Sequence, residues 1–198
     1  MEQLNQNLFL WLNASAHPIQ IVVSLAIFFA EYCIYLIPIF LIITWLRGDE
    51  STRKFLLEAV CAGLVGLLLN QSISALWQHP RPFMMGLGRT LIPHVADSSF
   101  PSDHLTLLWS VSFSFLSYQP FRSIGAAFTL LGLPMAWARI YLGIHFPLDM
   151  LGAILVAVLS AWSGYILSSL YLAFTYKITI SIHHLLFKKL IRIGWVKK

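Results

Sequence analysis

Arg81 is the first residue whose type and setting suggest chemistry, because it stands between Pro80 and Pro82 directly after a long apolar run. The two prolines end a helix and hold the chain extended, so the guanidinium should have a defined direction. A guanidinium offers a planar fork of donors that matches phosphate oxygens. Alternatively, Arg81 reaches to lipid headgroups at a membrane surface, and this segment alone does not separate the two interpretations.

A second polar group stands where a later apolar run begins, in the sequence Ser98-Ser-Phe-Pro-Ser-Asp-His104. Ser102 is predicted to be the N-cap of a helix, with Asp103 and His104 in its first turn. The free N–H groups and positive dipole end of such a turn can bind phosphate, and His104 could act there as an acid. An ordinary helix cap is the plainer interpretation of Ser102 taken by itself.

A third group combines Arg139 with His145 and Asp149. Pro147 suits the first turn of a helix, which puts His145 just before that helix and Asp149 in its first turn. The carboxylate could bind one imidazole nitrogen and leave the other free to attack. Alternatively, Asp149 only complements the helix dipole. The two arginines, two histidines, serine and aspartate together favour the chemical interpretation.

The elements that must position these residues are predicted to be membrane helices. The 198-residue chain is 58% hydrophobic and only 11% charged, with a mean hydropathy of +0.76. This composition excludes a disordered chain, a nucleic-acid-binding tail and an ordinary soluble globule. We expect an all-α bundle in one domain, residues 1–198. Its five transmembrane helices are Ile19–Leu46, Phe55–Trp77, Ser102–Tyr118, Ser123–Tyr141 and Pro147–Phe174.

Basic residues predict the orientation, since their excess marks the cytoplasmic side. One side holds ten of the 13 cations. These are Arg47, Arg53, Lys54, Arg122, Lys177, Lys188, Lys189, Arg192, Lys197 and Lys198. The other side holds Arg81, Arg89 and Arg139. We therefore expect a cytoplasmic C-terminus, with the loops 78–101 and 139–147 facing outward.

The two terminal segments are expected to lie against the membrane rather than cross it. Residues 1–16 lack the basic start of a signal peptide, and Leu4, Leu8, Trp11 and Leu12 share one helical face, which predicts a short interfacial helix. The tail 177–198 is basic; it serves to fix the topology, or it forms an amphipathic helix on anionic lipid. The cysteines, Cys33 and Cys61, form no metal-ligand spacing.

Taken together, the three polar segments resemble the motifs of the type 2 phosphatidic acid phosphatase superfamily. The match consists of Arg81-Pro82, of Pro101-Ser-Asp-His104, and of Arg139 followed by His145 and Asp149. Three stretches resemble, more narrowly, the bacitracin-resistance type of undecaprenyl pyrophosphate phosphatase: Glu31-Tyr32, Thr90-Leu-Ile-Pro-His94 and Ser99-Phe-Pro-Ser-Asp-His104. The five-span layout fits the same branch.

The resemblance implies a role for each matching position. His145 would be the nucleophile, Asp149 would orient it, and His104 would protonate the leaving group and later activate water. Arg81, Ser102 and Arg139 would hold the transferred phosphoryl group. Possible secondary residues are Glu31, His79, His94 and Asp103, of which Asp103 would cost anion binding unless it pairs with Arg81 or His104.

The sequence departs from the superfamily pattern at three positions. Ser74 stands where the first motif usually opens with lysine, Asp103 replaces a glycine, and Ala138 replaces the serine before Arg139. The missing lysine removes one phosphate-binding cation. The Asp103 replacement is a feature of the bacitracin-resistance branch.

The expected function is removal of the terminal phosphate from undecaprenyl pyrophosphate at the outer face of a bacterial cytoplasmic membrane, without metal or cofactor. This activity would recycle the cell-wall carrier lipid and lower sensitivity to bacitracin. The alternatives are a phosphatase or phosphotransferase for phosphatidylglycerophosphate, phosphatidate or lipid A, and a non-catalytic lipid-binding or transport protein.

A metal site made of His79, His94, His104 and His145 fits no zinc spacing. The expected partners are the lipid substrate and membrane lipids, with no nucleic acid.

Overall fold

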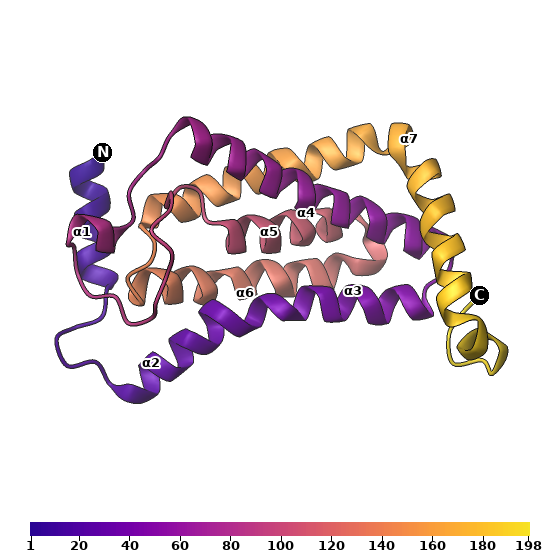
Figure 1. Cartoon of the computed structure of the whole chain (residues 1–198), viewed down its shortest axis with the longest axis horizontal. Coiled ribbons are helices and arrows are strands. Elements are labelled where there is room, and N and C mark those ends of the chain that lie inside the picture. Colours follow the sequence, from indigo (N-terminus) through magenta and orange to yellow (C-terminus); the bar gives the residue numbers. More distant parts are fainter.

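A computed structural model describes all residues from Met1 to Lys198 and contains helices and loops only. The long helices run side by side, as Figure 1 shows, with loops and short helices at both ends. The elements are α1 (Glu2–Leu12), α2 (Gln20–Ile27), η1 (Phe28–Tyr32), η2 (Cys33–Tyr35), α3 (Leu36–Arg47), α4 (Glu50–Leu76), η3 (Pro82–Met85), α5 (Asp103–Ser117), η4 (Gln119–Phe121), α6 (Arg122–Tyr141) and α7 (Pro147–Arg192).

Four of the five expected spans are helices long and apolar enough to cross a membrane, which makes the chain a membrane protein. They are Gln20–Arg47, Glu50–Leu76, Gln119–Tyr141 and Pro147–Arg192. The remaining one, expected over Ser102–Tyr118, is α5. Its 15 residues extend about 22 Å, whereas the hydrocarbon core of a bilayer is about 30 Å thick. The structure therefore supports a helical bundle with four candidate spans around a shorter helix.

Helix α5 is polar because protein surrounds it rather than lipid. It packs against α4, α6 and α7, and Figure 1 shows it in the middle of the bundle. Its buried serines find partners within the protein: Ser112 Oγ donates to Leu108 O of the same helix at 2.6 Å, and Ser110 Oγ lies 2.8 Å from Ser160 Oγ of α7. Small hydroxyl residues let neighbouring backbones approach closely and satisfy their own hydrogen bonds.

The first span contains a change of helical form at Glu31. Here α2 passes into the π-helical turn η1, in which the N–H of Cys33 bonds to Phe28 O. The 3-10 turn η2 follows, and α3 then continues the span. Such insertions bend a helix and occur often at functional sites. Figure 1 shows α2 diverging from the bundle on the far side of this turn.

The two ends of the chain lie at opposite ends of the bundle (Figure 1). Helix α1 lies across one end, beside the turn between α6 and α7, and this end is called the α1 end below. The face of α1 expected to meet the membrane is largely exposed, including Leu4 and Trp11, while Phe9 is buried.

Helix α7 continues past Phe174, the expected end of the last span, to Arg192. Its last third bends across the end of the bundle opposite α1 (Figure 1). The buried Arg53 of α4 holds the chain beyond it, donating from Nη2 to Lys197 O at 2.7 Å and from Nη1 to Lys198 O at 3.0 Å. The cationic tail is therefore packed against the bundle.

A substitution at Gly132 of α6 would test how tightly this core is packed. A Cβ atom at position 132 would come within 2.2 Å of Trp109 Nε1, and that nitrogen already donates to Thr129 O at 3.1 Å. We expect Gly132→Ala to destabilise the protein by about 1–3 kcal/mol, measured as a lower melting temperature in detergent. Leu130→Ala, at an exposed position of the same helix, is the control. A melting temperature at or above that of the wild type would contradict this packing.

Candidate active site

Residues from all three polar segments line one cavity at the α1 end of the bundle. The cavity has a volume of about 190 Å³, and Arg81, His104 and His145 contribute to its wall. Arg81 comes from the loop after α4, His104 from the first turn of α5, and His145 from the turn before α7. Helix ends meet here, which explains how residues 64 positions apart become neighbours.

His145 and Asp149 form a buried pair at the start of α7. His145 Nδ1 lies 3.0 Å from Asp149 Oδ2. The same carboxylate oxygen accepts a hydrogen bond from the Phe146 N–H at 2.8 Å and another from Ser99 Oγ. This arrangement favours the tautomer with the proton on Nδ1, so the lone pair of the ring belongs to Nε2.

The free nitrogen of His145 faces Arg81. Arg81 Nη1 lies 3.1 Å from His145 Nε2 and donates to Ile144 O at 2.8 Å. Arg81 Nε forms an ion pair with Asp97 Oδ1 at 2.7 Å. The guanidinium is therefore held in one plane against the nitrogen that would attack.

The surroundings of His145 keep its ring neutral. Burial lowers the pKa of His145 well below its usual value, and the positive charges of Arg139 and Arg81 lower the pKa further. A neutral imidazole retains the lone pair that a nucleophile needs. The environment thus favours the reactive form of the ring.

Arg139, the second expected phosphate ligand, is anchored by the π-helical turn η1. Its Nη1 donates to Ala30 O at 3.0 Å and lies 3.9 Å from Glu31 Oε1. The Glu31 carboxylate therefore lies within ion-pair distance of a cation of this site. Arg139 is buried, and its Nε has no hydrogen-bond partner within the protein, which leaves a donor available for an anion.

Ser102 occupies the N-cap position of α5, as predicted, but its hydroxyl does not cap the helix. The Oγ atom is buried and has no partner within the protein. Buried polar atoms are nearly always hydrogen-bonded. The hydroxyl of Ser102, like Arg139 Nε, is therefore free to bind a further group.

Asp103 pairs with neither Arg81 nor His104. Its two carboxylate oxygens accept hydrogen bonds from α4, at 2.9 Å from Asn70 Nδ2 and at 3.2 Å from Gln71 Nε2. Two neutral amides therefore bind this carboxylate in place of the cationic partners considered from the sequence.

The two secondary histidines lie in different surroundings. His94 lines the cavity, with its ring centre 6.3 Å from that of His145, and burial lowers its pKa. His79 lies outside this cavity; its Nε2 is 3.4 Å from Glu2 Oε2, and its ring packs edge-on against Phe146. It lines an adjoining cavity of about 410 Å³. A metal site of all four histidines is therefore not formed.

Several residues of the site were missed by reasoning from the sequence. Ser99 binds Asp149, Asp97 binds Arg81, and the amides of Asn70 and Gln71 bind Asp103. Adjacent amides in an apolar helix are costly without partners, so Asn70-Gln71 was a signal that could have been used. Asp97 carried no signal, because charged residues are common in loops.

Comparisons with known proteins agree on one family. A family model described as "PAP2 superfamily" matches residues 55–177. The chain is 34% identical to YbjG of Escherichia coli, over 100% of this chain and 99% of that protein. It is 36% identical to "Undecaprenyl-diphosphatase BcrC" of Bacillus subtilis, over 79% of this chain and 80% of that one. The "Bacitracin transport permease protein BcrC" of Bacillus licheniformis is 30% identical over 80% of this chain and 78% of its own.

A solved structure has the same fold. The crystal structure of Aquifex aeolicus LpxE superposes with a TM-score of 0.62 and 26% sequence identity, covering 85% of this chain and 96% of that one. The similarity therefore extends over most of the helical bundle.

The neutrality of His145 can be measured directly. In protein labelled with ¹⁵N-histidine, we expect the ring nitrogens of His145 to keep the chemical shifts of an Nδ1-protonated neutral imidazole from about pH 8 down to about pH 5.5. A lowered pKa means that protonation begins only at more acidic pH. The spectrum of His145→Gln would assign the signals. Titration of His145 near pH 6.5, the ordinary value, would contradict the expectation.

Proposed function

The chain belongs to the PAP2 superfamily, and we propose that it removes the terminal phosphate of undecaprenyl pyrophosphate to give undecaprenyl phosphate. The observation that carries this proposal is the buried His145–Asp149 pair, whose free Nε2 faces Arg81 at the wall of the cavity. The name of the Bacillus subtilis relative supports the substrate. The activity is that of an undecaprenyl-diphosphate phosphatase.

In the first step, His145 Nε2 attacks the terminal phosphorus. The N–P bond forms as the bond between this phosphorus and the bridging oxygen breaks. The bridging oxygen leaves with undecaprenyl phosphate and takes a proton from His104. Burial and the nearby cations lower the pKa of His104 to about 3, so the negative charge of the bound diphosphate must raise this pKa for His104 to act as the acid. The ring of His145 becomes a cation, which Asp149 stabilises through its contact with Nδ1 at 3.0 Å.

In the second step, water replaces the imidazole. His104, now neutral, removes a proton from a water molecule, whose oxygen attacks the phosphorus as the N–P bond breaks. Inorganic phosphate leaves, and Nε2 recovers its lone pair. His104 regains the proton that it needs for the next cycle, so the histidine pair returns to its starting state.

The two arginines and Ser102 bind the oxygens of the transferred group. Phosphoryl transfer depends chiefly on positioning and on stabilising charge at these oxygens. Arg81 Nη1, which lies 3.1 Å from Nε2 in the structure, exchanges this contact for a phosphoryl oxygen when the substrate enters. Arg139 Nε and Ser102 Oγ supply the further donors.

The secondary residues adjust this anion site. Glu31 holds Arg139, and His94 lies in the cavity wall next to the leaving group. The amides of Asn70 and Gln71 hold Asp103, which limits repulsion between its carboxylate and the substrate. His79 lies beside the diphosphate, in the adjoining cavity.

The protein lies in a bacterial cytoplasmic membrane with the α1 end outward, and residues 1–198 act as one domain. The cationic helix ends at the opposite side, together with the tail 177–198, face the cytoplasm. Helix α1 lies in the outer interface. The product re-enters cell-wall precursor synthesis, and removal of the pyrophosphate lowers sensitivity to bacitracin.

Two alternative functions share part of this support. Phosphatidylglycerophosphate, phosphatidate or lipid A would undergo the same chemistry in the same cavity. A transport function without catalysis has support from the name of the Bacillus licheniformis relative. The His145–Asp149 pair has no use in transport alone, and for this reason we favour catalysis.

The first experiment is release of phosphate from undecaprenyl pyrophosphate by purified protein in detergent with excess EDTA. We expect release by the wild type, and a rate lower by roughly 10⁴-fold or more for His145→Ala, because the variant lacks the attacking nitrogen. His17→Ala, at an exposed loop position, is the control and should retain the wild-type rate.

The outcomes separate the alternatives. Faster release from another lipid phosphate would reassign the substrate and keep the chemistry. Bacitracin resistance that survives His145→Ala in cells would favour transport. Loss of wild-type activity in EDTA would show that a metal takes part.

The orientation of the bundle in the membrane can be tested separately. Alkaline phosphatase needs disulfides, and it is therefore active only outside the cytoplasm. We expect activity from a fusion after Gly86, in the loop at the α1 end, and none from a fusion after Arg122, at the opposite end. The reverse pattern would invert the topology and move the site to the cytoplasmic face.

A further inference from the structure

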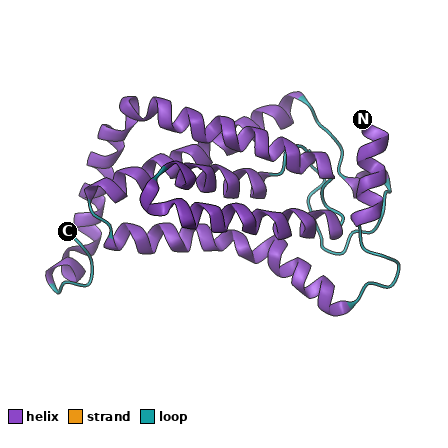
Figure 2. Ribbon diagram, turned by 180° about the vertical axis from the view of Figure 1, so that it is seen from behind, coloured by secondary structure: helices purple, strands orange, loops and turns teal.

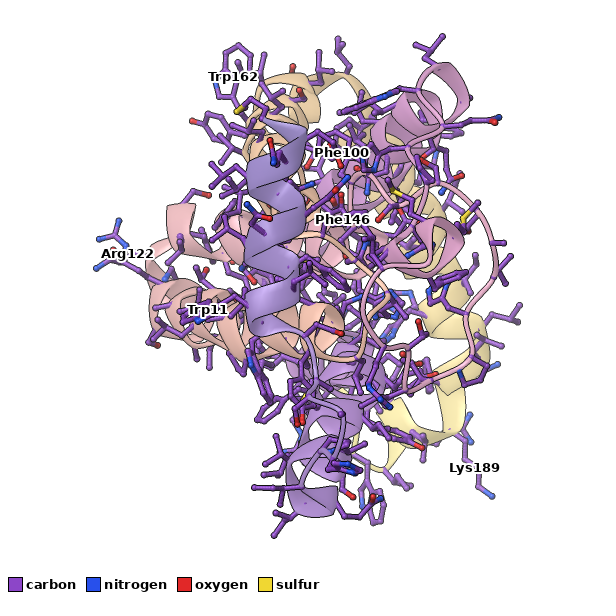
Figure 3. The ribbon with its side chains drawn as sticks, turned by 90° about the vertical axis from the view of Figure 1, so that its left-hand side faces the viewer. Trp11, Phe100, Arg122, Phe146, Trp162 and Lys189 are labelled. Atoms are coloured by element: carbon purple, nitrogen blue, oxygen red, sulfur yellow. The ribbon has the colours of Figure 1, made fainter.

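Helix α1 contacts both ends of the segment that carries His145. This segment, Tyr141–Asp149, is called the nucleophile segment below. Figure 3 looks onto the α1 end of the bundle and shows α1 in front, with Phe146 beside it and Trp11 near its lower end. The contacts are made by buried side chains of α1 and by the residues just after it.

At the far end of the nucleophile segment, Asn5 caps α7. Pro147 has no N–H group, and the N–H of Asp149 bonds to Phe146 O at 3.1 Å. The N–H of Leu148, another donor of the first turn, donates to Asn5 Oδ1 at 3.0 Å. Asn5 is only 2% exposed, so this cap is a fixed contact inside the protein.

At the near end, Asn13 and Ala14 bind the last turn of α6. Asn13 Nδ2 donates to Tyr141 O at 3.0 Å, and the N–H of Ala14 donates to the same oxygen at 3.1 Å. Asn13 also exchanges two hydrogen bonds with the backbone of Arg89. The residues after α1 thus hold the start of the segment and the loop beside it.

Phe9 fills the space between these two anchors. It is fully buried and packs edge-on against Phe146, with ring centres 5.3 Å apart. Gly88 makes room for it, because a Cβ there would come within 2.7 Å of the Phe9 ring. Phe146 is adjacent to His145, so this contact bears directly on the position of the imidazole.

We propose that α1 is a positioning element for the nucleophile and that Asn5 is its principal positioning residue. This inference rests on the proposed phosphatase function. By capping the turn that contains Asp149, Asn5 sets the distance between Asp149 and His145, and so the direction of Nε2. A displacement of about 1 Å at a reacting group can cost roughly 10²-fold in rate.

A positioning role and a merely structural role differ in what they change. If α1 only anchored the fold, loss of Asn5 would lower the amount of folded protein and leave the turnover of the folded fraction unchanged. If Asn5 positions the nucleophile, the folded variant binds substrate normally and forms the phosphohistidine slowly. The rate of phosphoenzyme formation distinguishes these cases.

The test compares variants of the full-length protein with undecaprenyl pyrophosphate as substrate. Asn5→Leu removes the accepting oxygen at similar volume, and Asn5→Asp keeps an oxygen that can cap the helix. Gln3→Leu, an exposed position of the same helix, is the matched control. Steady-state rates give kcat and KM, and acid quenching after a few milliseconds gives the rate of phosphoenzyme formation.

We expect Asn5→Leu to lower kcat and phosphoenzyme formation together, by about 10- to 100-fold, with KM within about threefold of the wild type. Asn5→Asp should recover most of the loss, and Gln3→Leu should match the wild type. If Asn5→Leu yields no folded protein, Asn5→Ala removes the amide without adding bulk and carries the same expectation.

Three results would overturn the inference: a kcat within threefold of the wild type, an effect confined to KM, or equal losses in Asn5→Leu and Asn5→Asp. Wild type and His145→Ala are assayed alongside. Wild-type release that His145→Ala abolishes, with Asn5→Leu unaffected, refutes the positioning role alone. Absence of release by the wild type refutes the proposed function, and the inference with it.

Discussion

The contact between His145 and Asp149 is the constraint on which the rest of the site depends. A buried carboxylate is costly unless hydrogen bonds compensate for the loss of water. For Asp149 this compensation falls on Oδ2, which accepts from a backbone N–H and a serine hydroxyl and contacts the imidazole, while Oδ1 has no partner within the protein. Pro147 starts the helix between the two residues, which places them one turn of backbone apart. The reactive nitrogen then has a single direction, toward Arg81, and the other helix ends are arranged around that direction.

Much of the site could be predicted because its parts are local in sequence. The His145–Asp149 pair spans one helical turn, and Ser102 stands at a helix start that its neighbours specify. Contacts between distant segments could not be predicted in this way. Nothing in the loop around Asp97 indicates that it meets Arg81, and the pairing of Asn70 with Asp103 depends on how α4 and α5 pack. Such pairings are set by tertiary structure, which a single sequence does not reveal.

The fold shows the same division between local and tertiary information. Apolar runs were sufficient to find the four long helices, because lipid-facing residues must be apolar all along a span. They say less about α5, whose serines reflect protein neighbours on its sides, and about α7, which continues as a helix beyond the apolar run that ends at Phe174. In both regions composition reports the environment of a residue, while helix length is decided by backbone hydrogen bonding and packing.

The anchor of Arg139 has a consequence for how this protein can vary. Its nearest partner is the carbonyl of Ala30, a backbone group in the π-helical turn, and every amino acid carries that group. Replacing the side chain at position 30 would therefore not remove the interaction, because any residue there supplies the same carbonyl. The number of residues in the turn does affect the interaction, because a π-helical turn is an α-helix with one residue inserted. Lineages that gained or lost a single residue between Phe28 and Tyr32 would have rotated the carbonyl away, so the length of this stretch should be more strictly maintained than its composition.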